Sequence, residues 1–169
     1  MLMTPDKVGE VTLHLGWRGG FHQVTFGGGP YDAMLGPHNK RPGTYGVALC
    51  NGKICVGDAD VHLALGDLGV PKSAAAVESA IFDVYHAAFR GEKVYVGCVG
   101  GYGGTGLFLA LLAKTAGIEQ PVVWTREHYD STAVGTNKQA AYISGFDVAE
   151  VRYKVRWAAW LMRVGIELY

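Results

Sequence analysis

The stretch KVYVGCVGGYGGTGLFLALLAKT, residues 93–115, decides the fold of this chain. Residues 94–96 form a short β-branched and aromatic run, typical of a strand buried on both faces. Five glycines follow between positions 100 and 106, and residues 107–113 are strong helix formers. The stretch therefore predicts a strand, a glycine-rich turn and a helix in direct succession.

A glycine-rich turn between a strand and a helix is suited to holding an anion. Glycine lets successive backbone N–H groups converge, and the unpaired N–H groups of the helix's first turn add partial positive charge. Phosphate is a common ligand of such a turn. The candidate phosphate-binding residues are Val99, Gly100, Gly101, Tyr102, Gly103, Gly104 and Thr105.

Two known motifs fit this turn. Residues 101–106 satisfy the dinucleotide-binding pattern G-x-G-x-x-G, although that pattern is expected near the start of a long βαβ series. The other motif starts at Cys98. Residues 98–106 resemble the phosphate loop of the cysteine-dependent protein tyrosine and dual-specificity phosphatases, in which His-Cys is followed by five residues, Arg, Ser or Thr, and Gly.

Matches and departures within this loop both fall on groups that carry chemistry. Cys98, Thr105 and Gly106 stand where the family has its cysteine, its hydroxyl residue and its closing glycine. Gly97 replaces the histidine, and Gly104 replaces the arginine. The resemblance therefore implies a degenerate member of the family.

Segments on either side of the loop extend the resemblance. Before its nucleophile strand the family has a Trp-Pro-Asp type loop that ends in Gly-Val-Pro. The sequence LGDLGVP holds this place and puts Asp67 in the general-acid position. Downstream, dual-specificity members often have Thr-x-x-Gln and an aromatic residue, which here are Thr136, Gln139 and Tyr142. The resemblance covers residues 61–146, about half of the chain.

The resemblance implies a role for each matched side chain. Cys98 would attack phosphorus, and Asp67 would protonate the leaving oxygen. Thr105 would stabilise the departing thiolate, and Gln139 would position water. The family's arginine holds two phosphate oxygens and neutralises charge in the transition state, which Gly104 cannot do. Because losing one oxyanion donor costs on the order of 10²–10³ in rate, efficient turnover is not expected.

The leading hypothesis is thus a catalytically impaired phosphatase-like protein that binds, and could sequester, a phosphate-bearing ligand. That ligand would be a phosphorylated metabolite, a nucleotide or a phosphoprotein. One alternative is an active phosphatase that is slow or recruits a remote arginine, for which the candidates are Arg18, Arg41 and Arg126. Another is a small dinucleotide-binding or structural module. In that case Cys98 is a packed thiol, Asp67 a turn residue and Gln139 a surface residue.

The order of elements predicts an α/β fold of the tyrosine-phosphatase type, with a mixed sheet, N-terminal β-hairpins and a helical C-terminal half. One hairpin is expected around residues 18–20 and a second in residues 45–56, turning at Asn51-Gly52. Residues 27–43 predict a loop between them.

Helix boundaries are marked by capping residues. Ser73 predicts the start of an amphipathic helix and Gly91 its end. A buried helix is expected to begin near Thr105. Later helices are expected to begin at Pro121, Asn137 and Asp147.

Length and composition place limits on function. The 169 residues predict a single domain. The net charge is zero, so no overall field attracts nucleic acid or an anionic membrane, and neither partner is expected. The N-terminus resembles no secretory signal, and the longest apolar run is too short to span a bilayer. Three cysteines and six scattered histidines predict a cytoplasmic protein with no disulfide framework, no metal and no cofactor.

Overall fold

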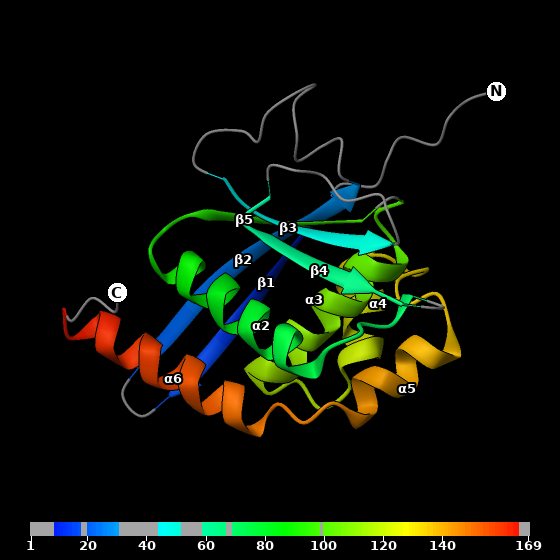
Figure 1. Cartoon of the computed structure of the whole chain (residues 1–169). Helices are drawn as coiled ribbons and strands as arrows, with labels where there is room; N and C mark the ends of the chain where they lie inside the picture. The colour runs from blue at the N-terminus through cyan, green and yellow to red at the C-terminus, as the bar shows by residue number, and fades with distance from the viewer. Residues whose placement is uncertain are drawn as a thin grey trace.

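The described part of the chain forms one mixed sheet with helices gathered against one side of it (Figure 1). The computed structural model describes residues 9–17, 20–30, 44–51, 59–66, 69–98 and 100–165. The strands are β1 (Gly9–Trp17), β2 (Gly20–Pro30), β3 (Thr44–Asn51), β4 (Val61–Leu65) and β5 (Lys93–Cys98). Their order is β1-β2-β5-β3-β4, and only the β1–β2 pair is antiparallel. The predicted mixed α/β sheet is confirmed.

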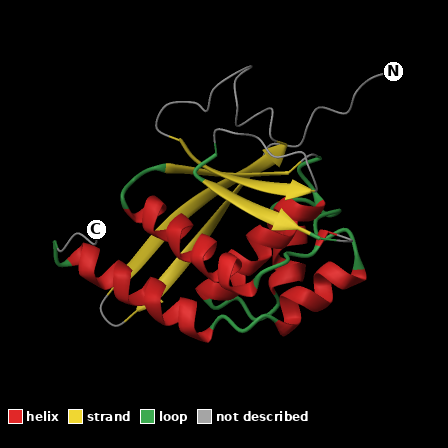
Figure 2. Ribbon diagram, in the orientation of Figure 1, coloured by secondary structure: helices red, strands yellow, loops and turns green. Residues whose placement is uncertain are grey.

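In the described residues five helices lie on the same side of this sheet, as Figure 2 shows. They are α2 (Ala74–Phe89), α3 (Gly103–Ala116), α4 (Pro121–His128), α5 (Asn137–Gly145) and α6 (Ala149–Arg163). The predicted cap of α2 is confirmed, since Ser73 Oγ accepts from Ala76 N at 3.2 Å. Asp147 Oδ1 likewise accepts from Ala149 N at 2.9 Å at the start of α6.

The first predicted hairpin is formed by β1 and β2, which pair along the whole of β1. However, β2 continues to Pro30 beside β5, so the loop predicted over residues 27–43 is wrong for residues 27–30. Residues 31–43 lie outside the described residues. Glycines serve here for close packing and not for a turn. A Cβ on Gly28 would lie 2.9 Å from Thr105 Cγ2 and 3.1 Å from Tyr129 Cε2, so only glycine lets α3 lie this close to β2.

The second predicted hairpin is wrong for β3. This strand runs parallel to β5 along residues 44–48 and parallel to β4 along residues 47–51, so both of its edges have parallel partners. Strand β3 ends at Asn51, the first residue of the predicted Asn-Gly turn. The returning half of the predicted hairpin lies outside the described residues.

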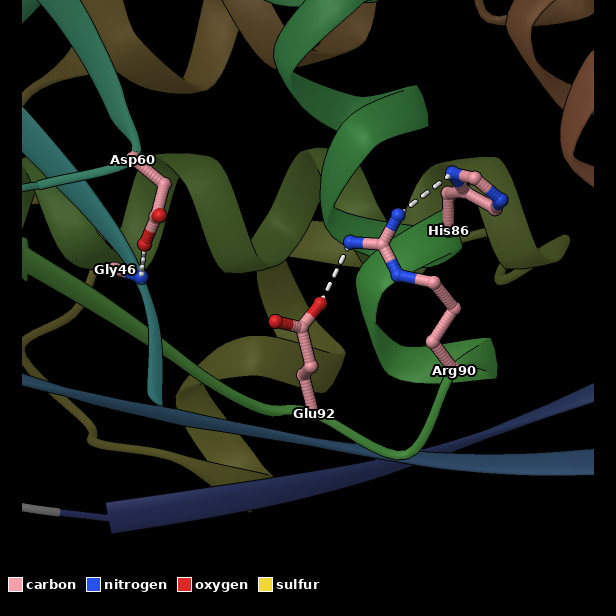
Figure 3. Close-up of polar contacts among 5 residues, drawn as sticks. All are labelled: Gly46, Asp60, His86, Arg90 and Glu92. Carbon is pink, nitrogen blue, oxygen red and sulfur yellow. Dashed lines mark hydrogen bonds and ion pairs between the residues drawn. The ribbon is translucent and has the colours of Figure 1, made fainter. Parts of the chain in front are cut away.

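Charged contacts fix the amino ends of the parallel strands (Figure 3). Arg90, after α2, pairs with Glu92 at 2.6 Å and lies 3.4 Å from His86 Nδ1. Asp60, before β4, accepts from the Gly46 backbone N–H of β3 at 2.8 Å. Cys98 ends β5 at the opposite, carboxyl end of these strands, where α/β sheets usually bind ligands.

Helix α3 is the buried centre of the helical layer. It begins at Gly103, earlier than predicted, and its residues 104–113 are all buried. Tyr85 of α2 donates to the Leu112 carbonyl at 2.5 Å. Arg152 of α6 donates to the carbonyls of Lys114 and Thr115 at the end of α3. Contacts from two other helices therefore hold α3 in place.

In the part of the chain that the structure describes, no single helix is long and apolar enough to cross a bilayer. Only α3 and α4 taken together, with a 120° bend between them, meet that test of length and composition.

Gly106→Ala tests the close packing of α3. An added Cβ would lie 2.7 Å from Ala133 Cβ and 2.8 Å from Val134 N, so the turn after α4 would have to shift. We expect the free energy of unfolding in urea to fall by about 1–3 kcal/mol. Gly145→Ala is the control, because nothing lies within 4 Å of its added Cβ, and it should be neutral or slightly stabilising. Equal losses in both variants would contradict the packing.

Candidate functional site

The loop between β5 and α3 folds around the thiol of Cys98, which is buried. The Gly101 N–H donates to Cys98 Sγ at 3.2 Å, and Thr105 Oγ1 lies 3.2 Å from the same sulfur. Gly101 has a φ of +80°, which favours glycine. A Cβ there would also lie 2.8 Å from Gly29 C and Pro30 N, so the loop rests directly on the end of β2.

The rest of the loop opens into the first turn of α3. Gly100 is exposed, Tyr102 is half-buried, and Gly103 is the first residue of the helix. Tyr102, the N-cap, makes no side-chain capping bond, and the first turn contains no acidic residue. The N–H groups of the first turn therefore have no side-chain acceptor from their own helix, as an anion site requires.

Tyr129, which the sequence analysis missed, holds the loop from behind. Its hydroxyl donates to the Gly101 carbonyl at 2.5 Å, and the residue is buried. Burial raises the pKa of Tyr129 above its ordinary value, so the hydroxyl stays protonated and remains a donor. Tyr95 makes a similar bond to the Pro30 carbonyl at 2.9 Å. No local motif marks Tyr129, because its partner is 28 residues away.

The position that the sequence resemblance assigns to the family's arginine is closely packed. Gly104 lies in the first turn of α3, and a Cβ there would be 3.0 Å from Leu65 Cδ1 and 3.3 Å from Cys98 Cβ. Leu65 and Leu49 border this space from the ends of β4 and β3. Gly104 thus supplies no cation beside the sulfur, and its neighbours are apolar.

Gln139 of α5 lies beside the loop, and its interpretation as a surface residue is wrong because the side chain is only 4% exposed. Its Nε2 donates to the Gly69 carbonyl at 3.2 Å. Both amide atoms lie 3.6 Å from the Cβ position of Gly103. Gln139 Oε1 is buried and has no hydrogen-bond partner among the described residues. A buried acceptor therefore lies beside the first turn of α3.

Three residues of the predicted site region lie outside the described residues: Asp67, Leu68 and Val99. Gly66 and Gly69, which flank positions 67 and 68, are described, and Gly66 donates to the Val70 carbonyl at 2.6 Å. Gly69, whose carbonyl binds Gln139, donates to the Gly66 carbonyl at 3.1 Å. Gln139 therefore joins the segment next to Asp67 to α5, and the role of Asp67 stays a prediction.

Arg126 supports the site without facing it. Its Nε donates to the Ala133 carbonyl at 3.0 Å, and its Nη2 donates to the Val134 carbonyl at 2.8 Å. Ala133 lies against Gly106 of α3, so this arginine fixes the turn on which α3 packs. Arg18 and Arg41 lie outside the described residues. Among the described residues, no group of three or more His, Cys, Asp or Glu side chains could hold a metal ion.

Two proteins of Methanocaldococcus jannaschii, both named as uncharacterised, are similar to this chain in sequence. No protein-family model matches the chain. "Uncharacterized protein MJECL20" of Methanocaldococcus jannaschii is 34% identical over 83 residues, which are 49% of this chain and 56% of that protein. "Uncharacterized protein MJ0215" of the same organism is 32% identical over 83 residues, 52% of its length. The chain thus spans about half the length of the curated relatives it matches.

Comparisons with solved structures concern the fold. The kinase associated phosphatase KAP, solved with its catalytic-site cysteine replaced by serine, gives a TM-score of 0.56 at 18% identity, covering 91% of this chain and 98% of KAP. The chain has a protein-tyrosine-phosphatase-like fold. A mutant form of Tk-PTP gives a TM-score of 0.49 at 15% identity, over 67% of this chain and 79% of that protein. The fold that the sequence predicted is confirmed.

Tyr129→Phe tests the support of the loop. Removing the hydroxyl leaves the buried Gly101 carbonyl without its partner, so the free energy of unfolding should fall by about 1–3 kcal/mol. Tyr142→Phe is the matched control, because the Tyr142 hydroxyl is buried and has no partner among the described residues. Its loss should be neutral or stabilising in the same urea titration. A Tyr129→Phe variant as stable as the wild type would contradict the assigned bond.

Proposed function

We propose that this chain is a phosphatase-related protein that binds a phosphate-bearing ligand at the β5–α3 loop and does not hydrolyse it efficiently. One observation carries the proposal. The buried Cys98 sulfur lies between the Gly101 N–H and the Thr105 hydroxyl, while Gly104 offers no side chain beside it. The donors for an anion are present, and the cation that this reaction needs is missing from its usual position.

Binding would rest on the main chain. The first turn of α3 has no capping side chain and no carboxylate to compete with a ligand. Its N–H groups and the partial positive charge of the helix start favour a phosphate group. Tyr129 and the β2 backbone hold Gly101 in the conformation that directs its N–H inward. These donors do not depend on any catalytic side chain.

Hydrolysis would need more than this. Charge builds on the phosphoryl oxygens in the transition state, and the family's arginine neutralises it with two parallel bonds. Gly104 offers none, and Arg126 is engaged with the carbonyls of Ala133 and Val134. The absence of such a donor costs on the order of 10²–10³ in rate. Binding without efficient turnover follows from this arrangement.

One observation favours the alternative of an active phosphatase. Gln139 Oε1 is a buried acceptor without a partner among the described residues, beside the first turn of α3. A water molecule that donates to it would lie near the phosphate site, as a hydrolytic water must. The two functions therefore use the same site and differ in the rate of phosphate hydrolysis, so a kinetic measurement separates them.

Phosphate binding should stabilise the folded protein. Phosphate, nucleotides and phosphopeptides form the panel, and a ligand at about 100 times its Kd adds about 2.7 kcal/mol. For a chain of this size that raises Tm by roughly 5–10 °C. No shift with any ligand at millimolar concentration would contradict the proposal.

Gly103→Asp places a carboxylate at the anion site and should abolish this shift. The variant should still fold, because its Cβ meets only the Gln139 amide at 3.6 Å and a helix start favours an acidic residue. Gly103→Ala is the control without charge and should keep the shift. A shift that persists in Gly103→Asp would place the ligand elsewhere on the protein.

Gly104→Arg should create hydrolytic activity. We expect negligible turnover of 4-nitrophenyl phosphate by the unchanged protein and a rise of at least about 10²-fold in the variant, because arginine restores the bidentate donor. The Leu65 side chain must yield to the new Cβ, and its Cδ1 is the end of a flexible chain. Adding Cys98→Ser should remove all of the gained activity.

Wild-type kinetics decide between the two functions. If the unchanged protein turns over substrate at about 1 per second or faster, as typical enzymes do, and Cys98→Ser stops it, the chain is an active phosphatase and the binding role is wrong.

A further inference from the structure

Helix α6 carries large apolar side chains on its outward face. In the described residues, four of the five exposed large hydrophobic residues lie on α6 or at its C-cap. They are Tyr153, Trp157, Trp160 and Val164, exposed by 64%, 46%, 40% and 51%. At about 100° per residue, these positions fall within an arc of about 60°. We call them the α6 stripe. Its two tryptophan rings stack with centroids 5.1 Å apart.

The packing of the described residues leaves the α6 stripe exposed. The opposite side of the helix buries Val151, Val155 and Ala158 in the helical layer, and that side suffices to hold α6 in place. Figure 1 shows α6 along the outside of this layer, next to α2. Contiguous exposed aromatic surface of this kind marks an interaction site.

Basic residues flank the stripe. At about 100° per residue, Arg156 and Arg163 lie on one side of it and Lys154 on the other. The helix has four basic side chains and one acidic one, Glu150, which pairs with Lys154 at 2.8 Å, whereas the net charge of the whole chain is zero. The sequence-based expectation of no membrane partner rested on that whole-chain balance, and α6 departs from it locally.

A second copy of the chain fits this surface poorly. In a symmetric antiparallel pair, the same flank of each helix meets its counterpart. The flank with Arg156 and Arg163 would therefore face the same flank of the other copy, and like charges would repel.

Lipid suits both features of α6. Tryptophan and tyrosine rings are apolar with one polar group, and they concentrate at the boundary between lipid and water. Arginine and lysine side chains are attracted to anionic headgroups. We propose that α6 binds flat on an anionic lipid surface, with Tyr153, Trp157 and Trp160 at the acyl boundary and Arg156 at the headgroup phosphates.

The test uses the full chain and two kinds of vesicle: phosphatidylcholine with phosphatidylglycerol, and phosphatidylcholine alone. Co-sedimentation should show binding to the first kind and much weaker binding to the second. Trp157→Ser should lower partitioning into the vesicles at least about tenfold, because it removes a ring that lipid would bury. Arg156→Gln should lower it about fivefold, the equivalent of about 1 kcal/mol for one charge at the surface.

Controls separate lipid binding from misfolding and from the phosphate site. Val123→Ser removes an exposed apolar residue of α4 and should leave binding unchanged. Tyr153→Ser, at the most exposed position of the stripe, should also weaken binding and provides a second variant if Trp157→Ser fails to fold. Gly103→Asp should bind vesicles normally, since the phosphate loop is a separate site.

Four results would overturn the proposal. The wild type could fail to bind anionic vesicles. Alternatively, the Trp157→Ser and Tyr153→Ser variants could bind them as well as the wild type does. It could also form a dimer in light scattering that Trp157→Ser dissociates, in which case a second copy covers the stripe. Loss of vesicle binding in Gly103→Asp alone would likewise assign the lipid headgroup to the loop and not to α6.

Discussion

The close approach of the first turn of α3 to the end of β2 is the constraint on which the rest of the structure depends. Gly28 leaves room for Thr105, and Gly101 lies directly on the β2 backbone. On the other side of α3, Gly106 likewise leaves room for Ala133, which packs against the helix. The sulfur of Cys98 and the helix start are brought together by this packing. Fold and candidate site are therefore consequences of the same contacts.

Phosphatase catalysis combines two tasks, which are binding the anion and stabilising the transition state. Under the proposed function, backbone donors directed by the loop would hold an anion whatever the side chains are, because these donors belong to the fold. Stabilising a transition state needs a preorganised cation at a defined place, and apolar Leu49 and Leu65 border the position where Gly104 offers none. Gln139 keeps a buried acceptor that suits a water molecule. Under the proposed function, the site would bind phosphate and would lack the one charge that its hydrolysis needs.

Short sequence patterns predicted much of the fold. The run through Cys98 predicted the strand, turn and helix, and Ser73 predicted a cap that the structure confirms. The prediction of a loop from glycine failed where tertiary contacts decide the role of the residue. Gly28 is typical of a turn in the sequence, yet it lies in a central strand. The parallel partners of β3 and the bond from Tyr129 to Gly101 join distant segments. No local pattern reveals such contacts, and the role of Asp67 stays a prediction.

A phosphate titration followed by amide N–H correlation NMR tests the central claim most directly, because the proposed ligand contacts are backbone N–H groups. The account predicts that the signals of Gly101, Gly103, Gly104 and Thr105 shift together and saturate with one dissociation constant. Signals of α6 and of the amino ends of the parallel strands should stay in place. Saturable shifts confined to other residues, or none at millimolar phosphate, would contradict the account.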